Sequence, residues 1–334
     1  MTLNRRSSLF WLFLLLVGSL IALGSGRYSL SFYEVCLTLL SPFKDFADVS
    51  PTMKTVVFNV RLPRVLLALC AGAGLAGAGA AFQALFSNPL ATPDTLGVSA
   101  GSAFGASLGI LLGSSAMTIQ GISLCAGLAS VALVYAVSRV KNRSSILMLI
   151  LSGLVIAAFF SALISLVKYL ADPQDVLPAI TFWIMGTLTG ATFETLLVGL
   201  PFILTGCLLL FLLRWKLNVL SLPEDEAKSL GVPLARLRAL VVISGTMITA
   251  SVVSMCGLIG WVGLLIPHFV RLLYSNNNES VLPASLLLGA LFVLLADTLA
   301  RCATEVEIPV SILTSLIGAP VFIYLLRKTG GLQS

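Results

Sequence analysis

The chain alternates between long runs of apolar residues and short clusters of charged ones. Most runs have the length of about 20 apolar residues that a membrane-spanning helix needs. Runs free of Asp, Glu, Lys and Arg are residues 7–26, 65–93, 95–138, 144–167, 176–193, 195–213, 239–270, 280–296 and 308–326. Residues 95–138 and 239–270 are each long enough for two spans. The pattern predicts about eleven candidate spans.

The distribution of basic residues removes one candidate span. Residues 139–143 and 214–238 form basic loops, which the positive-inside rule places on the cytoplasmic side. An even number of spans must separate them, so residues 176–193 are expected to be an external or re-entrant segment. About ten spans remain, with both basic termini cytoplasmic. The predicted fold class is an all-α polytopic membrane protein with residues 1–334 as one transmembrane domain.

Composition agrees with this fold class. Hydrophobic residues make up 58% of the chain and charged residues only 10%, whereas a soluble domain usually carries about 25% charged residues. Lys and Arg in cytoplasmic loops explain the net charge of +6 better than a nucleic-acid partner does. Residues 28–51 lie outside in this topology, and their amphipathic pattern predicts a short helix along the membrane.

Residues 70–82, CAGAGLAGAGAAF, contain the G-x-G-x-x-G spacing of a dinucleotide-binding loop. Such a loop needs a soluble βαβ unit, whereas this stretch lies inside a charge-free run long enough to cross a membrane. Small residues four apart let neighbouring helices approach closely. The predicted helix-packing positions, on a span at the centre of the bundle, are Gly72, Gly74, Gly77 and Gly79.

No catalytic motif is visible in the sequence. The chain has one histidine, His268, and lacks the G-x-x-x-x-G-K-[ST] loop that binds ATP phosphates. His268 is interpreted as a satisfied polar group rather than a ligand. Residues 214–238 are the most polar internal stretch, in which three acids after Pro223 favour a helix start and Gly231 favours its end. The stretch is either a solvated connection or a docking element for a cytoplasmic partner.

Two further polar features lie within or between the apolar runs. Asp297 and Arg301 are four residues apart, so they can pair on one face of a helix. A structural pair near the outer boundary is preferred to a proton relay, although charged groups at membrane depth are functional candidates. Residues 86–97 form an inner turn with two prolines, either a plain connection or a gate loop at the cytoplasmic mouth.

Five motifs together resemble those of the permease subunits of type II ABC importers, which take up iron–siderophore complexes, haem and vitamin B12. In chain order they are RLPRVLLAL, FQALFSNPLATPDTLGVSAG, GLIGWVGLLIPHFVRLL, LPASLLLGALFVLLADTLAR and EIPVSILTSLIGAPVF. They cover nearly the whole chain. Ser87 departs from the Arg that is frequent before Asn-Pro-Leu-Ala, and Ser311 departs from a common Gly.

The resemblance implies a homodimeric pore, with the path between two copies of the chain in a bacterial or archaeal cytoplasmic membrane. It implies two cytoplasmic ATPase subunits, which would bind ATP and magnesium, so this chain is expected to hold no cofactor and to be no enzyme. A periplasmic or lipid-anchored binding protein would deliver the substrate. Membrane lipid surrounds such a protein, and nucleic acid is not an expected partner.

The resemblance also implies roles for individual residues. The residues expected to couple to the ATPase are Glu224, Asp225, Glu226, Ala227 and Gly231. Those expected to dock the binding protein at the outer rim are Arg61, Arg64 and Arg301. Those expected at the cytoplasmic gate are Asn88, Leu90, Ser144 and Ser145. No metal-binding or catalytic residue is expected.

The predicted function is ATP-driven import of a metal chelate, such as a ferric siderophore or haem, by alternating access. Import of vitamin B12 or of an oxyanion such as molybdate by the same mechanism is an alternative. An ion-coupled secondary transporter is another, for which Asp297 is the only convincing intramembrane carboxylate. A third alternative is a nucleotide-dependent membrane oxidoreductase, and only the glycine motif supports it.

Overall fold

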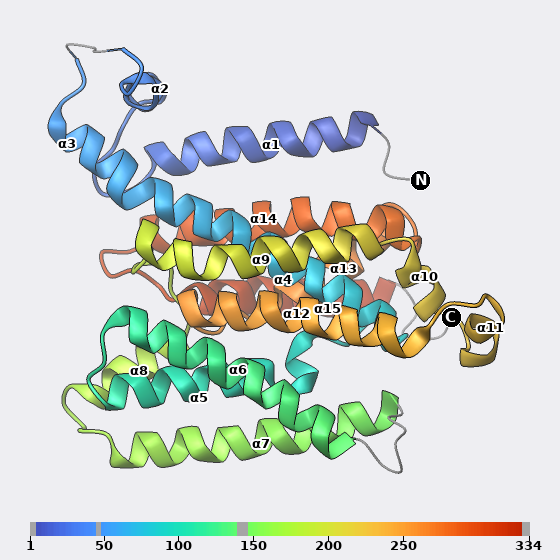
Figure 1. Cartoon of the computed structure of the whole chain (residues 1–334). Coiled ribbons are helices and arrows are strands. Elements are labelled where there is room, and N and C mark those ends of the chain that lie inside the picture. The colour runs from blue at the N-terminus through green and yellow to red at the C-terminus, as the bar shows by residue number, and fades with distance from the viewer. Residues whose placement is uncertain (1–4, 45–47, 139–145, 329–334) are drawn as a thin grey trace.

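The computed structural model describes residues 5–44, 48–138 and 146–328, which are largely helical and contain no β-strand. The long helices run side by side in one bundle (Figure 1). Seven helical stretches in these residues are long and apolar enough to cross a membrane. They are α1 (Arg5–Gly24), the continuous stretch α3, η1 and α4 (Pro51–Lys54, Thr55–Arg61, Leu62–Leu85), α6 (Ala116–Ser138), α7 (Ile146–Leu170), α9 (Phe193–Leu213), α12 (Leu234–Cys256) and α14 (Asn278–Cys302).

Three shorter apolar helices complete the bundle: α5 (Val98–Leu111), α13 (Val262–Leu273) and α15 (Val310–Lys328). Glycines with positive φ interrupt the two longest charge-free runs, at Gly113 between α5 and α6 (63°) and at Gly257 between α12 and α13 (69°). Each of these runs therefore holds two helices, as its length predicts. The 14 residues of α5 extend about 21 Å, less than the hydrocarbon core of about 30 Å.

The remaining helices are too short to span. The nine residues of α8 (Val176–Ile184) occupy the segment that charge parity excludes from the spans. α2 (Phe32–Leu40) begins with a capping box between Ser31 and Glu34 and lies crosswise to the bundle, so that Figure 1 shows it nearly end-on. The other short elements are η2 (Pro93–Leu96), α10 (Lys216–Leu220) and α11 (Glu224–Ser229).

α4 lies at the centre of the bundle and contacts α9, α12, α13 and α14. Its glycines touch the backbones of two neighbours: a Cβ on Gly72 would lie 2.1 Å from the carbonyl oxygen of Gly289, and one on Gly79 would lie 1.9 Å from that of Gly263. Gly74 and Gly77 instead face side chains of α12 and α14. Close contact of this kind replaces the hydrophobic effect as the source of packing energy in a membrane.

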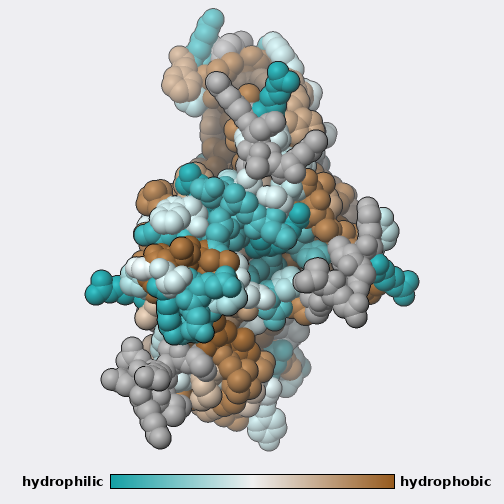
Figure 2. Space-filling view, turned by 90° about the vertical axis from the view of Figure 1, so that its right-hand side faces the viewer, coloured by the Kyte–Doolittle hydropathy of each residue, from teal (hydrophilic) through white to brown (hydrophobic). Residues whose placement is uncertain are grey.

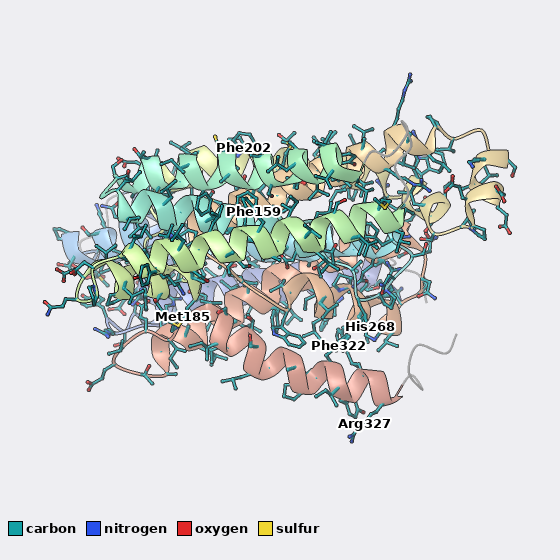
Figure 3. The ribbon with its side chains drawn as sticks, turned by 90° about the horizontal axis from the view of Figure 1, so that it is seen from below. Phe159, Met185, Phe202, His268, Phe322 and Arg327 are labelled. Atoms are coloured by element: carbon teal, nitrogen blue, oxygen red, sulfur yellow. The ribbon has the colours of Figure 1, made fainter. Side chains whose placement is uncertain are left out.

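The two ends of the bundle differ. We call the end that carries α10 and α11 the inner end, and the end that carries α2 and α8 the outer end (Figure 1). α1 starts and α15 ends at the inner end (Figures 1 and 3). Figure 2 looks onto the inner end and shows hydrophilic side chains gathered in its middle, with hydrophobic side chains around them.

Candidate functional site

α10 and α11 form an anchored element at the inner end, between α9 and α12. Three acids occupy the first turn of α11, where the helix dipole favours negative charge, and all three are exposed. Ala227 on the same helix is only 1% exposed and holds it against the bundle. Gly231 follows with a φ of 69°, which ends the element as the sequence predicts.

Glu224 connects α11 to α12. Its carboxylate pairs with Nζ of Lys228 at 2.9 Å and with Nη2 of Arg238 at 3.3 Å. Hydrogen bonds from Lys228 and Arg238 lower the pKa of Glu224 below its ordinary value. Because Arg238 lies on α12, the contact joins α11 to a helix that crosses the whole bundle. Sequence reasoning missed Arg238, whose distance from Glu224 along the chain hides the pairing.

Exposed leucines accompany the acids of α11. Leu222 is 40% exposed and Leu230 is 58% exposed, one on each side of the helix in the sequence. Leu217 and Leu220 of α10 are buried, and α10 packs against α4. The element thus exposes both leucines and acids on an anchored support, and its role in docking a cytoplasmic partner stays a prediction.

The inner turn between α4 and η2 is closed by its own polar groups. Oδ1 of Asn88 accepts a hydrogen bond of 2.9 Å from the backbone N–H of Leu90, and the N–H of Asn88 donates to the carbonyl of Gln83 at 3.1 Å. Leu90 is 41% exposed. The other two expected gate residues, Ser144 and Ser145, lie outside the described residues, so a gate that joins the two pairs stays a prediction.

At the outer end, two arginines satisfy the C-terminal carbonyls of α1. Such carbonyls lack partners within the helix. Nη1 of Arg61 donates to the carbonyls of Leu23 at 2.6 Å and Gly24 at 3.0 Å, and Nη2 of Arg301 donates to the carbonyl of Ala22. Their positive charge also opposes the negative end of the helix dipole. The two guanidinium groups thus fasten α1 to η1 and α14.

Arg64 forms a buried ion pair with Asp297. Nη2 of Arg64 lies 2.8 Å from Oδ1 of Asp297, and Nε donates to both carboxylate oxygens at 3.0 and 3.1 Å. Nη1 of Arg64 pairs with Glu307 at 2.9 Å, and Glu307 also accepts a hydrogen bond of 2.8 Å from Thr189. The network joins α4, α14, the link before α15 and the link between α8 and α9.

The structure confirms one expectation about these outer residues and corrects another. Asp297 pairs with Arg301 four residues away, with Nε 3.9 Å from the carboxylate, but Arg64 is its closer partner at 2.8 Å. The three arginines expected at an exposed rim are 4%, 7% and 7% exposed in the order Arg61, Arg64 and Arg301. They are buried because a carboxylate and helix-end carbonyls inside the bundle require hydrogen-bond donors. Their role in docking a binding protein stays a prediction.

A strained residue lies in the break between α12 and α13. Trp261 has a φ of 71°, which is unusual for a bulky side chain, and it leaves no space for a side chain at Gly318 of α15. Phe322 of α15 packs against Trp261, with ring centroids 6.3 Å apart. It also packs against His268, with ring centroids 5.7 Å apart; Figure 3 labels this second pair. Nε2 of His268 is buried without a hydrogen-bond partner among the described residues, so its interpretation as a satisfied polar group is wrong.

A bundle of long apolar helices with an anchored polar element at one end is the architecture of a polytopic membrane protein. The family model described as the FecCD transport family matches residues 14–328. The chain belongs to this family. It is a permease subunit of an ATP-driven ABC importer and a multi-pass protein of the cytoplasmic membrane.

Relatives in this family have several substrates. The chain is 46% identical over 321 residues to the molybdate import system permease protein of Haemophilus influenzae, covering 95% of each chain. It is 41% identical over 298 residues to the probable iron chelatin transport system permease protein of Helicobacter pylori, covering 89% of this chain and 90% of the other. A solved metal-chelate type ABC transporter in an inward-facing conformation is 42% identical, with a TM-score of 0.88 over 97% of this chain and all of the other.

Proposed function

We propose that two copies of this chain form the translocation path of an importer for a metal chelate, such as a ferric siderophore or haem. About ten helices cross the membrane, with both termini on the cytoplasmic side. The start of α1 and the end of α15 at the inner end support this topology. Two ATPase subunits bind ATP and magnesium at the inner end, and a binding protein delivers substrate at the outer end.

The observation that carries this proposal is the anchored element of α10 and α11. The expected coupling residues lie on it, with exposed acids and leucines directed away from a buried support. ATP binding draws the two ATPase subunits together and moves α11. The ion pair of Glu224 with Arg238 passes the motion to α12, and α10 passes it to α4. The helices around the path then expose the substrate to one side of the membrane at a time.

A second candidate substrate is an oxyanion such as molybdate. It is favoured by the 46% identity to the Haemophilus influenzae molybdate permease, against 41% for the Helicobacter pylori iron chelatin permease. The difference is small, and in such systems the binding protein sets much of the selectivity.

Reconstituted uptake tests both the class of protein and the substrate. The chain is placed in proteoliposomes with its cognate ATPase and binding protein, and uptake of radioactive iron chelate, haem, vitamin B12 and molybdate is compared with and without ATP. ATP-dependent accumulation of iron chelate or haem supports the proposal. If only molybdate accumulates, the substrate is the oxyanion and not a metal chelate. If substrate accumulates in response to an ion gradient without the ATPase, the proposal of an ABC importer is rejected.

A further inference from the structure

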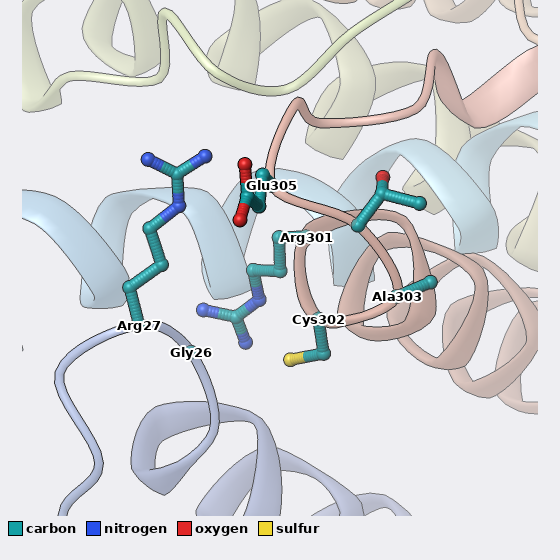
Figure 4. A pocket seen from close by; sticks show the side chains of 7 residues that line it. Gly26, Arg27, Arg301, Cys302, Ala303 and Glu305 are labelled. Atoms are coloured by element: carbon teal, nitrogen blue, oxygen red, sulfur yellow. The ribbon is translucent and has the colours of Figure 1, made fainter.

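A cavity of about 580 Å³ opens at the outer end, where α1 and α14 finish (Figure 4). Its lining consists of Gly26, Arg27, Arg301, Cys302, Ala303, Thr304 and Glu305. Arg27 is exposed at the rim, whereas Arg301 is 7% exposed. Arg301 is also one of the residues expected to dock the binding protein, and none of the other lining residues has an expected role in transport.

Arg301 has one donor group left for this cavity. Nη2 is engaged by the carbonyl of Ala22, and Nε is buried, without a hydrogen bond, 3.9 Å from the carboxylate of Asp297. Nη1 makes no hydrogen bond to any described residue. A nearly buried guanidinium group with an unused Nη1 suits hydrogen bonding to an anionic oxygen.

The charges around the cavity leave a positive excess. The basic residues of the cluster are Arg27, Arg61, Arg64 and Arg301, and the acidic ones are Asp297, Glu305 and Glu307. Arg64 forms ion pairs with both Asp297 and Glu307. The carboxylate of Glu305 faces Arg27 across the cavity (Figure 4). Arg61 and Arg301 both bond to carbonyls of α1, so no carboxylate is left for them alone. The excess suits a ligand with one negative charge.

The face of α14 that leads away from the cavity is apolar. Leu288, Leu291, Leu295, Leu299 and Cys302 recur at intervals of three or four residues and share this face. Leu295 is 49% and Leu299 is 53% exposed. The stripe leads into an apolar groove of about 260 Å³, which is also lined by Trp11 of α1 and by side chains of α13 and α15. From Leu291 to Cys302 the stripe covers about 16 Å, close to the depth of one leaflet.

We propose that the cavity and the stripe together bind one anionic phospholipid of the outer leaflet. The phosphate accepts hydrogen bonds from Arg27 and Arg301, and an acyl chain lies along the exposed leucines of α14. A free phosphate ion shares the chemistry of the headgroup but has no acyl chain that could contact the leucines of the stripe. The continuity of the charged cavity with an apolar face of membrane depth therefore favours the lipid. The inference does not depend on which substrate is imported.

Native mass spectrometry of the purified chain in detergent tests this binding. Phosphatidylglycerol, which is anionic, is expected to remain bound in preference to zwitterionic phosphatidylcholine. Arg27→Gln is expected to weaken phosphatidylglycerol binding about fivefold, the effect of one cationic side chain near a lipid surface. Lys54→Gln removes an exposed cation at the same end, outside the cavity, and is expected to leave binding unchanged. Thermal unfolding establishes that each variant is folded.

Two further measurements distinguish a lipid headgroup from a free phosphate ion. Leu299→Gln is expected to weaken phosphatidylglycerol while leaving any binding of inorganic phosphate unchanged. Displacement of the lipid by millimolar inorganic phosphate would show a site for free anions and overturn the proposal. Equal retention of both lipids, with no effect of Arg27→Gln, would also overturn it. Loss of binding-protein docking in Arg27→Gln with unchanged lipid retention would assign the cavity to a protein partner instead.

Discussion

Arg64 and Asp297 face each other across the interface of α4 and α14, with Nη2 and Oδ1 2.8 Å apart and the two side chains 8% and 0% exposed. They are 233 residues apart in the chain. Both carboxylate oxygens accept from one guanidinium group, which is the geometry that makes a buried charge pair tolerable. This pair fixes the outer half of the central helix against its main neighbour.

Removing one partner of this pair is expected to destabilise the protein strongly. Arg64→Met leaves the carboxylate of Asp297 buried without its principal partner, a change that costs about 3–5 kcal/mol. A lower midpoint of thermal unfolding in detergent measures the loss. The double variant Arg64→Met, Asp297→Leu removes both charges and is expected to recover much of it. A double variant that unfolds as early as the single one contradicts this explanation.

The surface of α11 is expected to carry the contact with the ATPase. Glu226→Lys reverses an exposed charge there. Gly231→Pro introduces proline at a position with a φ of 69°, which proline cannot adopt, so the end of the element must change its conformation. Both variants are expected to insert normally and to lose substrate uptake while the ATPase still hydrolyses ATP. Asn276→Lys, exposed at the same end between α13 and α14, is the control and is expected to transport normally. Full ATP-driven uptake by both variants rejects the coupling assignment.

The glycines of α4 are expected to differ in their tolerance of a methyl group. Gly79→Ala and Gly72→Ala place a Cβ within 1.9 and 2.1 Å of backbone carbonyl oxygens, so helices must separate, at a cost of about 1–3 kcal/mol or more. Gly77→Ala meets only the end of the Leu286 side chain at 2.6 Å, which can turn aside, whereas Gly77→Leu cannot be accommodated. Gly121→Ala has open space and serves as the control.

Size-exclusion chromatography with thermal unfolding ranks these glycine variants. The expected order of stability is Gly121→Ala, then Gly77→Ala, then the variants at Gly72 and Gly79. Wild-type behaviour of Gly79→Ala would show that α4 and α13 do not touch as described. A fully assembled and active Gly77→Leu protein would refute the burial of that face.

The outer ion network is expected to make stability depend on pH. Burial raises the pKa of Glu307, but the hydrogen bond from Thr189 and the charge of Arg64 outweigh it, so the pKa lies below the ordinary value. Its contribution is therefore present above the pKa of the unfolded chain, about 4.3, and is lost as pH falls through the lowered value. The midpoint temperature of thermal unfolding should fall more steeply below about pH 5 for wild type than for Glu307→Gln. Parallel curves would exclude the contribution, and Glu305→Gln is the neighbouring control.

Sequence patterns predicted the local features of this fold well. Charge-free runs located the helices, parity of the basic loops excluded α8 as a span, and the acids after Pro223 located α11. Contacts between distant segments could not be found this way. Asp297 does pair with Arg301 four residues away, as the spacing predicts, but its closer partner, Arg64, comes from α4. The sequence could not show this partner, because it shows spacing on one helix and not which helices are neighbours. Arg61 and Arg301 looked like exposed basic residues because backbone carbonyls, which every residue carries, leave no trace in the sequence.

The fastening of α1 has a consequence for the synthesis of the chain. Ala22 and the guanidinium group that bonds to it are 279 residues apart, so ribosomes complete nearly all of the protein before Arg301 exists. The first helix enters the membrane early, but its outer end gains this bond only when α14 arrives. A nascent chain cut short before that point leaves α1 without the Arg301 bond. The Arg301 bond at the end of α1 therefore forms only after translation has reached the last tenth of the polypeptide.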